Sequence, residues 1–139
     1  GASPEIIEAF TGYGLPLGEA FQIRDDVLGI FGDPGVTGKP AGDDIREGKR
    51  TFLIAATLEE TDPAQTKLVH DALGNPDLRA EDVTAIRRII VDTGALGRAE
   101  DHIASCTEQA LSALDTVDLT PPAREVLGDL ALAATNRRV

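Results

Sequence analysis

The spacing of apolar residues is the feature that most restricts how this chain can fold. No stretch alternates apolar and polar residues at every second position, as a half-exposed strand would. Apolar residues instead recur every three or four positions, most regularly over residues 95–117, where they share one face of a helix. The members of that face are Ala99, Ile103, Cys106, Ala110, Leu114 and Val117. The pattern therefore predicts an all-α fold.

Capping residues and helix breakers divide the chain into about six predicted helices. Ser3 and Pro4 favour a helix start, and a rough helical period continues to Phe31, with a kink expected near Pro16. Residues 32–48 are rich in Gly, Pro and Asp, so they predict a long loop with one turn of helix near its end. Loops of that length are usually functional. The other predicted helices cover residues 51–60, 62–74, 81–93, 95–117 and 120–135.

The charge of the chain restricts its partners. With 24 acidic and 13 basic side chains among 139 residues, the formal charge is −11, which argues against nucleic acid and anionic membrane surfaces as partners. The apolar fraction of 42% is enough for a core. Apolar runs such as residues 52–58 are far shorter than the roughly 20 residues that span a bilayer, so we expect no transmembrane helix.

The cysteine and histidine content restricts redox chemistry and metal binding. Cys106 is the only cysteine, which excludes an intrachain disulfide and the common cysteine-based zinc sites. His70 and His102 are too few, and too far apart in the sequence, to supply a zinc site in its place. A single cysteine suits a reducing compartment, and we expect a cytoplasmic protein.

Carboxylates gather near the end of the first predicted helix. Gln22, Asp25, Asp26 and Gly29 lie three or four residues apart in pairs, so they share one helix face. Adjacent carboxylates beside an apolar wall repel each other unless a cation lies between them. Oxygen ligands without histidine or cysteine favour Mg²⁺, which is commonly completed by substrate phosphates.

Two lysines in or beside the 32–48 loop are candidate phosphate-binding groups. Lys39 and Lys49 each follow a glycine, although a Gly-Lys pair taken alone is usually an ordinary surface feature. Neither belongs to a P-loop. Gly32 and Gly38 have five residues between them where the motif has four, and Pro40 stands where serine or threonine is required.

The ordered combination of these residues is far more specific than any one of them. It resembles the second aspartate-rich region of the trans-isoprenyl diphosphate synthases, the polyprenyl synthetase family, and within it the actinobacterial-type geranylgeranyl and polyprenyl diphosphate synthases. The resemblance implies that residues 1–139 are a single all-α region, the C-terminal helices of the isoprenoid synthase fold, and that 32–48 is an active-site loop. The residues that carry it are Phe21, Gln22, Asp25, Asp26, Leu28, Gly32, Asp33, Gly38, Lys39, Gly42, Asp43, Asp44, Gly48, Lys49 and Thr51.

The resemblance implies a prenyltransferase of isoprenoid biosynthesis. In that family an allylic diphosphate is held by Mg²⁺ ions, ionises to an allylic cation and is attacked by isopentenyl diphosphate, while the released pyrophosphate takes the final proton. Asp25 would be the direct metal ligand, and Asp26 a second ligand or a holder of metal-bound water. Lys39 and Lys49 would contact the allylic diphosphate.

Three further residues receive roles from the resemblance. Phe21 and Gln22 would lie at the junction of the two substrates, packing and hydrogen bonding without proton chemistry. Asp44 would be structural or a partner for a lysine. None of the seven residues is expected to act as a proton-transferring catalytic group.

The sequence departs from the family pattern in two ways. Gly29 stands where the motif Asp-Asp-x-x-Asp has its third carboxylate, a loss that should weaken metal binding, although a water could fill the gap. The first aspartate-rich motif is also absent, so we expect an incomplete, inactive fragment of an enzyme whose full-length parent is a homodimer. The alternative is a non-catalytic all-α regulatory or partner-binding subunit.

Overall fold

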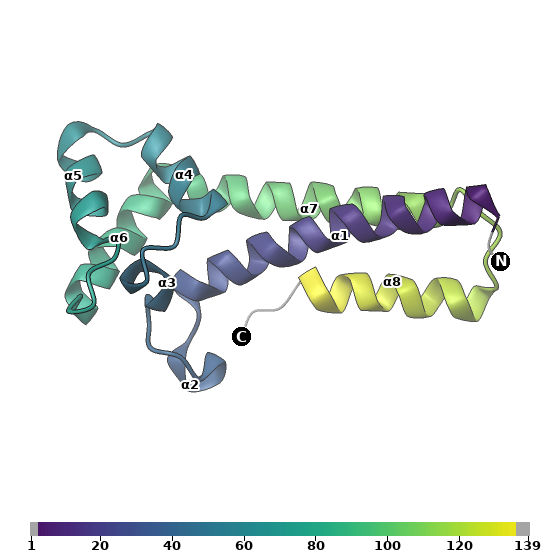
Figure 1. Ribbon diagram of the computed structural model, residues 1–139, viewed down its shortest axis with the longest axis horizontal. Coiled ribbons are helices and arrows are strands. Elements are labelled where there is room, and N and C mark those ends of the chain that lie inside the picture. The colour runs from purple at the N-terminus through teal and green to yellow at the C-terminus, as the bar shows by residue number, and fades with distance from the viewer. Residues whose placement is uncertain (1–2, 136–139) are drawn as a thin grey trace. The chain divides into compact units, whose positions relative to one another are not determined.

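The computed structural model describes residues 3–135, and within them it has eight helices and no strand (Figure 1). The all-α prediction is confirmed. Each predicted helix has a counterpart, and two single turns lie in the 32–48 loop, where one was expected. The helices are α1 (Pro4–Phe31), α2 (Pro34–Thr37), α3 (Asp43–Arg46), α4 (Phe52–Glu59), α5 (Pro63–Ala72), α6 (Ala80–Asp92), α7 (Ala95–Leu114) and α8 (Pro121–Thr135).

Helix α1 continues through Pro16 as one element, in agreement with the predicted helical period up to Phe31, and the kink near Pro16 stays a prediction. Proline removes only one N–H from the helical hydrogen bonds, and packing on either side of it holds the helix together. Tyr13 and Leu17 flank Pro16 and belong to an apolar cluster with α7 and α8. The helix starts as predicted, since the Ser3 hydroxyl accepts a hydrogen bond from the amide of Ile6 at 3.3 Å.

Helix α7 ends three residues earlier than predicted. Its last residue is Leu114, because the following amides of Asp115 and Thr116 donate to carbonyls only three residues back, at 3.1 and 3.3 Å. Such bonds tighten the chain into a turn and end the α-helical pattern. Helix α8 begins at Pro121, where the Thr120 hydroxyl accepts from the amide of Ala123.

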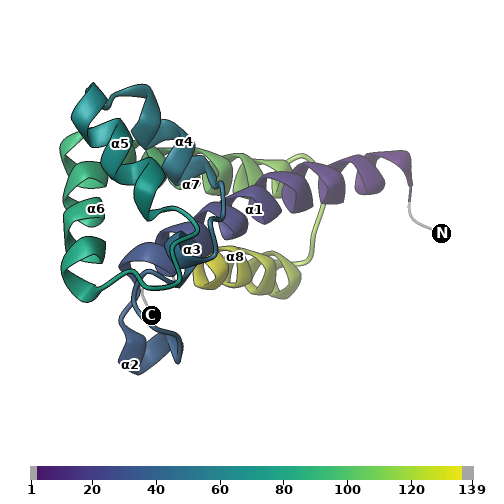
Figure 2. The ribbon, with the colours of Figure 1, turned by 60° about the vertical axis from the view of Figure 1, so that its left-hand side comes forward.

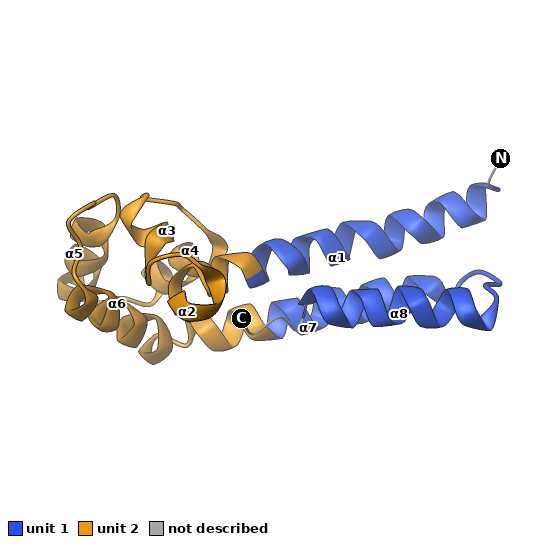
Figure 3. Cartoon of the chain, turned by 90° about the horizontal axis from the view of Figure 1, so that it is seen from below, with its two compact units in different colours: residues 1–24, 101–137 blue, residues 25–100, 138–139 orange. Residues whose placement is uncertain are grey.

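The described residues form two compact units, which we treat separately (Figure 3). The first unit contains residues 3–24 and 101–135, that is, most of α1 and α7 together with α8. Its helices are joined by apolar packing and by buried polar contacts. The Tyr13 hydroxyl donates to the carbonyl of Leu127 at 2.8 Å, and the Arg24 Nε donates to the carbonyl of Thr135 at 2.8 Å.

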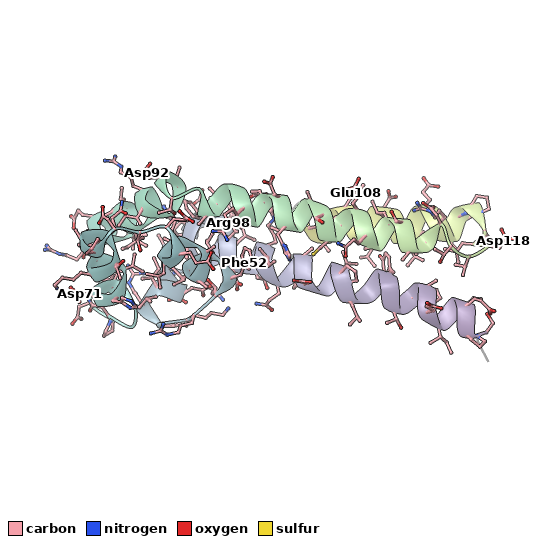
Figure 4. The ribbon with its side chains drawn as sticks, turned by 90° about the horizontal axis from the view of Figure 1, so that it is seen from above. Phe52, Asp71, Asp92, Arg98, Glu108 and Asp118 are labelled. Carbon is pink, nitrogen blue, oxygen red and sulfur yellow. The ribbon has the colours of Figure 1, made fainter. Side chains whose placement is uncertain are left out.

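The second unit contains residues 25–100, in which α6 packs against both α4 and α5 (Figure 2). Arg87 on α6 donates from Nε to the carbonyl of Ile30 at 2.6 Å, so it satisfies an acceptor at the end of α1, a helix with no basic residue of its own in the last turn. Arg98 of α7 pairs with Glu59 of α4 at 2.9 Å (Arg98 is labelled in Figure 4). The core includes Ile30, Ile45, Leu53, Ile54, Val69, Val83 and Ile90.

None of the helices within residues 3–135 combines the length and the apolar character that crossing a bilayer requires.

Candidate active site

Lys49 places its ammonium between two carboxylates in the second unit. Its Nζ lies 3.6 Å from Asp26 Oδ1 and 3.7 Å from Asp44 Oδ2. The Asp26 and Asp44 side chains are 6% and 12% exposed, whereas the Lys49 side chain is 46% exposed. The distances are those of ion pairs and are longer than good hydrogen bonds. The lysine therefore offsets the repulsion between the two acids, with its outer side open to solvent.

Contacts at both ends of α3 fix the position of Asp44. Gly42, just before α3, has φ 75°, and a side chain there would overlap Val83 at 2.7 Å. At the other end of α3, the amide of Gly74 donates to the carbonyl of Ile45 at 2.8 Å, and Ile45 is buried. Only glycine allows this close approach of the loop to α6, and the loop backbone is held from both ends.

Arg46 adds a second anchor to the same loop. Its guanidinium donates to the carbonyl of Leu78 from Nε and Nη2, at 3.2 and 2.9 Å, and to the carbonyl of Ala41 from Nη1 at 2.5 Å. The five N–H donors of a planar guanidinium lie in a fixed fork, which holds the two carbonyls at defined positions. These hydrogen bonds hold the backbone at the end of the 32–48 loop, from which the Asp44 side chain extends.

Gly29 makes room for the Asp44 carboxylate. A Cβ built on Gly29 would collide with the Oδ2 and Cγ atoms of Asp44. The space in which a side chain at position 29 would begin is occupied by the carboxylate of Asp44. The sequence pattern contained Asp44 but had no signal that it faces position 29, because that contact depends on how the loop folds.

The other predicted site residues differ in their exposure and in the unit to which they belong. Asp25 is half-buried on α1 beside Asp26. Lys39 is exposed after α2 and forms no ion pair with a carboxylate of residues 3–135, so it is not brought to Asp26 and Asp44. Phe21 and Gln22 are exposed on the part of α1 that belongs to the first unit.

The loop carboxylate Asp33 has a structural role. Its Oδ1 accepts from the amide of Gly35 at 2.9 Å and so caps α2. By contrast, Asp25, Asp26 and Asp44 bring three carboxylates to this part of the second unit, and Lys49 contacts two of them. Carboxylate oxygens are the ligands that suit a hard divalent cation.

Comparisons with known proteins identify the family. The family model described as Polyprenyl synthetase matches residues 1–90, which include the whole carboxylate and lysine cluster. The chain belongs to the polyprenyl synthetase family. The geranylfarnesyl diphosphate synthase of Aeropyrum pernix is 37% identical over 139 residues, which are 100% of this chain and 42% of that relative. The geranylgeranyl diphosphate synthase of Mycobacterium tuberculosis is 34% identical over 113 residues, 81% of this chain and 31% of that relative.

Solved structures of polyprenyl synthetases share the fold. A crystal structure of geranylgeranyl pyrophosphate synthase from Corynebacterium glutamicum, complexed with isoprenyl diphosphate and magnesium, matches with a TM-score of 0.93 and 44% identity. The match covers 99% of this chain and 39% of that one. The chain therefore spans about two fifths of the length of these full relatives, and it has the helical fold of isoprenoid synthases.

Proposed function

We propose that this chain carries the second metal- and diphosphate-binding half of a prenyltransferase site, which joins an allylic diphosphate to isopentenyl diphosphate. The observation that supports the proposal best is the cluster of Asp26, Asp44 and Lys49 beside Asp25, on the segment that matches the family. The related structure from Corynebacterium glutamicum is complexed with isoprenyl diphosphate and magnesium, in agreement with this chemistry.

The donor set fits Mg²⁺. Asp25 is half-buried, so its carboxylate can bind the ion directly, and buried Asp26 can add a second ligand or hold a metal-bound water. When bound, Mg²⁺ neutralises the charge that develops on the leaving diphosphate. Asp25 and Asp26 keep their oxygens fixed on successive positions of α1, which limits the reorganisation needed for binding.

Lys49 is suited to bind diphosphate oxygens. At 3.6 and 3.7 Å from its two carboxylates, its ammonium is held in place while its N–H donors remain available to a phosphate. Asp44 acts on Lys49 and so positions it. Lys39, on the exposed part of the loop, would add a second cation to the same diphosphate. Phe21 and Gln22 would contact the substrates without transferring a proton.

We further propose that the 139-residue chain does not catalyse prenyl transfer by itself, and that the longer protein is a homodimer. The test uses labelled isopentenyl diphosphate, an allylic diphosphate and Mg²⁺. The chain alone should form no product, and product formation would contradict this proposal. In a longer protein that also carries a first aspartate-rich motif, Asp25→Asn should lower kcat/KM by at least about 100-fold.

The exposed carboxylate Asp92, at the end of α6 in the same unit, provides the matched control for that test (Figure 4). Asp92→Asn removes the same charge away from the cluster, so activity should stay close to the unsubstituted protein. Equal activity of the Asp25→Asn and unsubstituted proteins would contradict the metal-ligand assignment.

A non-catalytic partner-binding subunit is the second candidate. Large apolar side chains on the first unit are exposed, among them Leu15 at 72% on α1 and Val126 at 65% on α8. Exposed apolar side chains of this size often mark a surface that binds another chain. A longer protein with no prenyl transfer, and in which Asp25→Asn has no effect on diphosphate binding, would favour this candidate.

A further inference from the structure

Three side chains of different chemistry meet in the first unit. Glu19 comes from α1, whereas His102 and Cys106 lie one turn apart on α7. One ligand atom of each residue lies within 4.8 Å of the others. The His102 Nε2 and Glu19 Oε1 atoms are 2.8 Å apart. We expected no zinc site because the chain has one cysteine and only two histidines, far apart in the sequence. The contact of Glu19 with α7 joins segments far apart in the sequence and has no pattern that reveals it.

The three residues provide one buried sulfur ligand and two solvent-accessible ligands, a nitrogen and an oxygen. Cys106 is only 3% exposed, whereas the side chains of His102 and Glu19 are 39% and 57% exposed. An ion can therefore approach from the Glu19 and His102 side while Cys106 forms the floor of the site. The spacing of His102 and Cys106 places both on the same helix face without any backbone change.

We propose that Glu19, His102 and Cys106 bind one divalent zinc-type ion, with water as the fourth ligand. Zinc accepts sulfur, nitrogen and carboxylate ligands and commonly keeps an open position when the protein supplies three. The thiolate and imidazole ligands discriminate against Mg²⁺, which prefers oxygen. The site is therefore distinct in chemistry from the Asp25 and Asp26 carboxylates, and it does not depend on the proposed prenyltransferase function.

The observed spacing needs only small side-chain movements to accept the ion. Zinc bonds of about 2.0–2.3 Å at tetrahedral angles place ligand atoms roughly 3.3–3.7 Å apart. The Glu19–His102 contact must open by about half an ångström, and the widest pair must close by about 1 Å. Both exposed side chains can make these changes by rotation, since each lies on the surface of its helix.

Metal binding by Cys106 requires the loss of its thiol proton. Burial, and secondarily the neighbouring Glu19 carboxylate, raises the pKa of the Cys106 thiol, so the thiol is protonated without a metal. Binding of the ion forms the sulfur–metal bond and releases that proton to solvent. Without a metal, the same residues would be a surface Glu–His pair above a protonated thiol.

Cobalt binding to the purified chain tests the proposal, because a thiolate ligand gives Co²⁺ a charge-transfer absorption band that carboxylates and imidazoles do not. We expect this band to appear at one Co²⁺ per chain and to disappear when Zn²⁺ is added. Glu19→Gln and His102→Gln should each weaken Zn²⁺ binding by at least about tenfold. Both side chains are exposed, so these two variants avoid the risk that a buried Cys106→Ser variant does not fold.

Two controls make the result specific. His70→Gln removes the other histidine, on α5 in the second unit, and Asp25→Asn removes the proposed magnesium ligand, so neither should change the cobalt band. Absence of the band from the unsubstituted chain would overturn the proposal. Zinc affinity unchanged in both Glu19→Gln and His102→Gln would do so as well, whatever the outcome for diphosphate binding.

Discussion

The carboxylate of Asp44 lies where a side chain at position 29 would extend from α1, so Gly29 and Asp44 share one space. Asp44 can therefore pair with Lys49 only because position 29 has no side chain. The absence of a third motif carboxylate at position 29 thus leaves the space that the Asp44 carboxylate occupies.

This shared space predicts opposite effects of the same substitution at two positions of α1. Gly18 has nothing within 4 Å of a built Cβ, so Gly18→Ala should raise the free energy of unfolding by about 0.5–1 kcal/mol through helix propensity. Gly29→Ala should lower it by about 1 kcal/mol, because the clash with Asp44 outweighs the same gain. Urea denaturation of the two variants measures the difference.

The double variant separates the clash from other effects of the alanine. In an Asp44→Ala background, Gly29→Ala should stabilise the chain much as Gly18→Ala does. Equal stabilisation at positions 18 and 29 with Asp44 present would show that the carboxylate moves aside without cost, against the arrangement described above.

Restoring the motif carboxylate should not restore the site. Gly29→Asp brings a third motif acid to α1 but forces Asp44 away from Lys49, so Mg²⁺-dependent binding of inorganic pyrophosphate should weaken by about tenfold. Calorimetric titration measures this change. Tighter binding by Gly29→Asp than by the unsubstituted chain would mean that Asp44 has no positioning role.

Removal of the Lys49 ammonium should destabilise the second unit. Lys49→Gln leaves two largely buried acids without their shared cation, and we expect a loss of about 1 kcal/mol because the lysine itself is half exposed. Lys67→Gln breaks only the exposed pair with Asp71, which solvent screens, so the free energy of unfolding should change much less than in Lys49→Gln. Equal losses for the two variants in urea denaturation would contradict the structural role of Lys49.

Tyr13 should make stability depend on pH in the alkaline range. Burial raises the pKa of the Tyr13 phenol, whose hydroxyl donates to the carbonyl of Leu127. Its contribution, about 1 kcal/mol, is present below the pKa of the unfolded chain near 10 and declines as pH rises toward the folded value. The stability difference between the unsubstituted chain and Tyr13→Phe should therefore shrink between about pH 9 and pH 11. A constant difference in thermal unfolding would contradict this assignment.

Much of the fold could be predicted because helix signals are local. Caps such as Ser3 and Thr120, and the apolar period of α7, depend on residues within a few positions of one another. The packing of Tyr13 and Leu17 on either side of Pro16 could not be predicted, because it depends on helices far away in the sequence.

In the candidate site, too, the motif residues could be predicted from the sequence, whereas contacts between distant segments could not. The motif identified Asp26 and Lys49 as members of one site, and the structure places them in an ion pair. The roles of the predicted residues toward metal and substrates stay predictions. The overlap of Asp44 with position 29, and the approach of Glu19 to Cys106, depend on contacts between segments far apart in the sequence.

Calorimetric titration of inorganic pyrophosphate into the purified chain, with and without Mg²⁺, tests the proposed metal and diphosphate site most directly. We expect binding that requires Mg²⁺, that Asp25→Asn weakens by at least about tenfold, and that Asp92→Asn leaves unchanged. Binding that is independent of Mg²⁺, or equally strong in the Asp25→Asn chain, would contradict the claim that this helix and loop hold a metal-bound diphosphate.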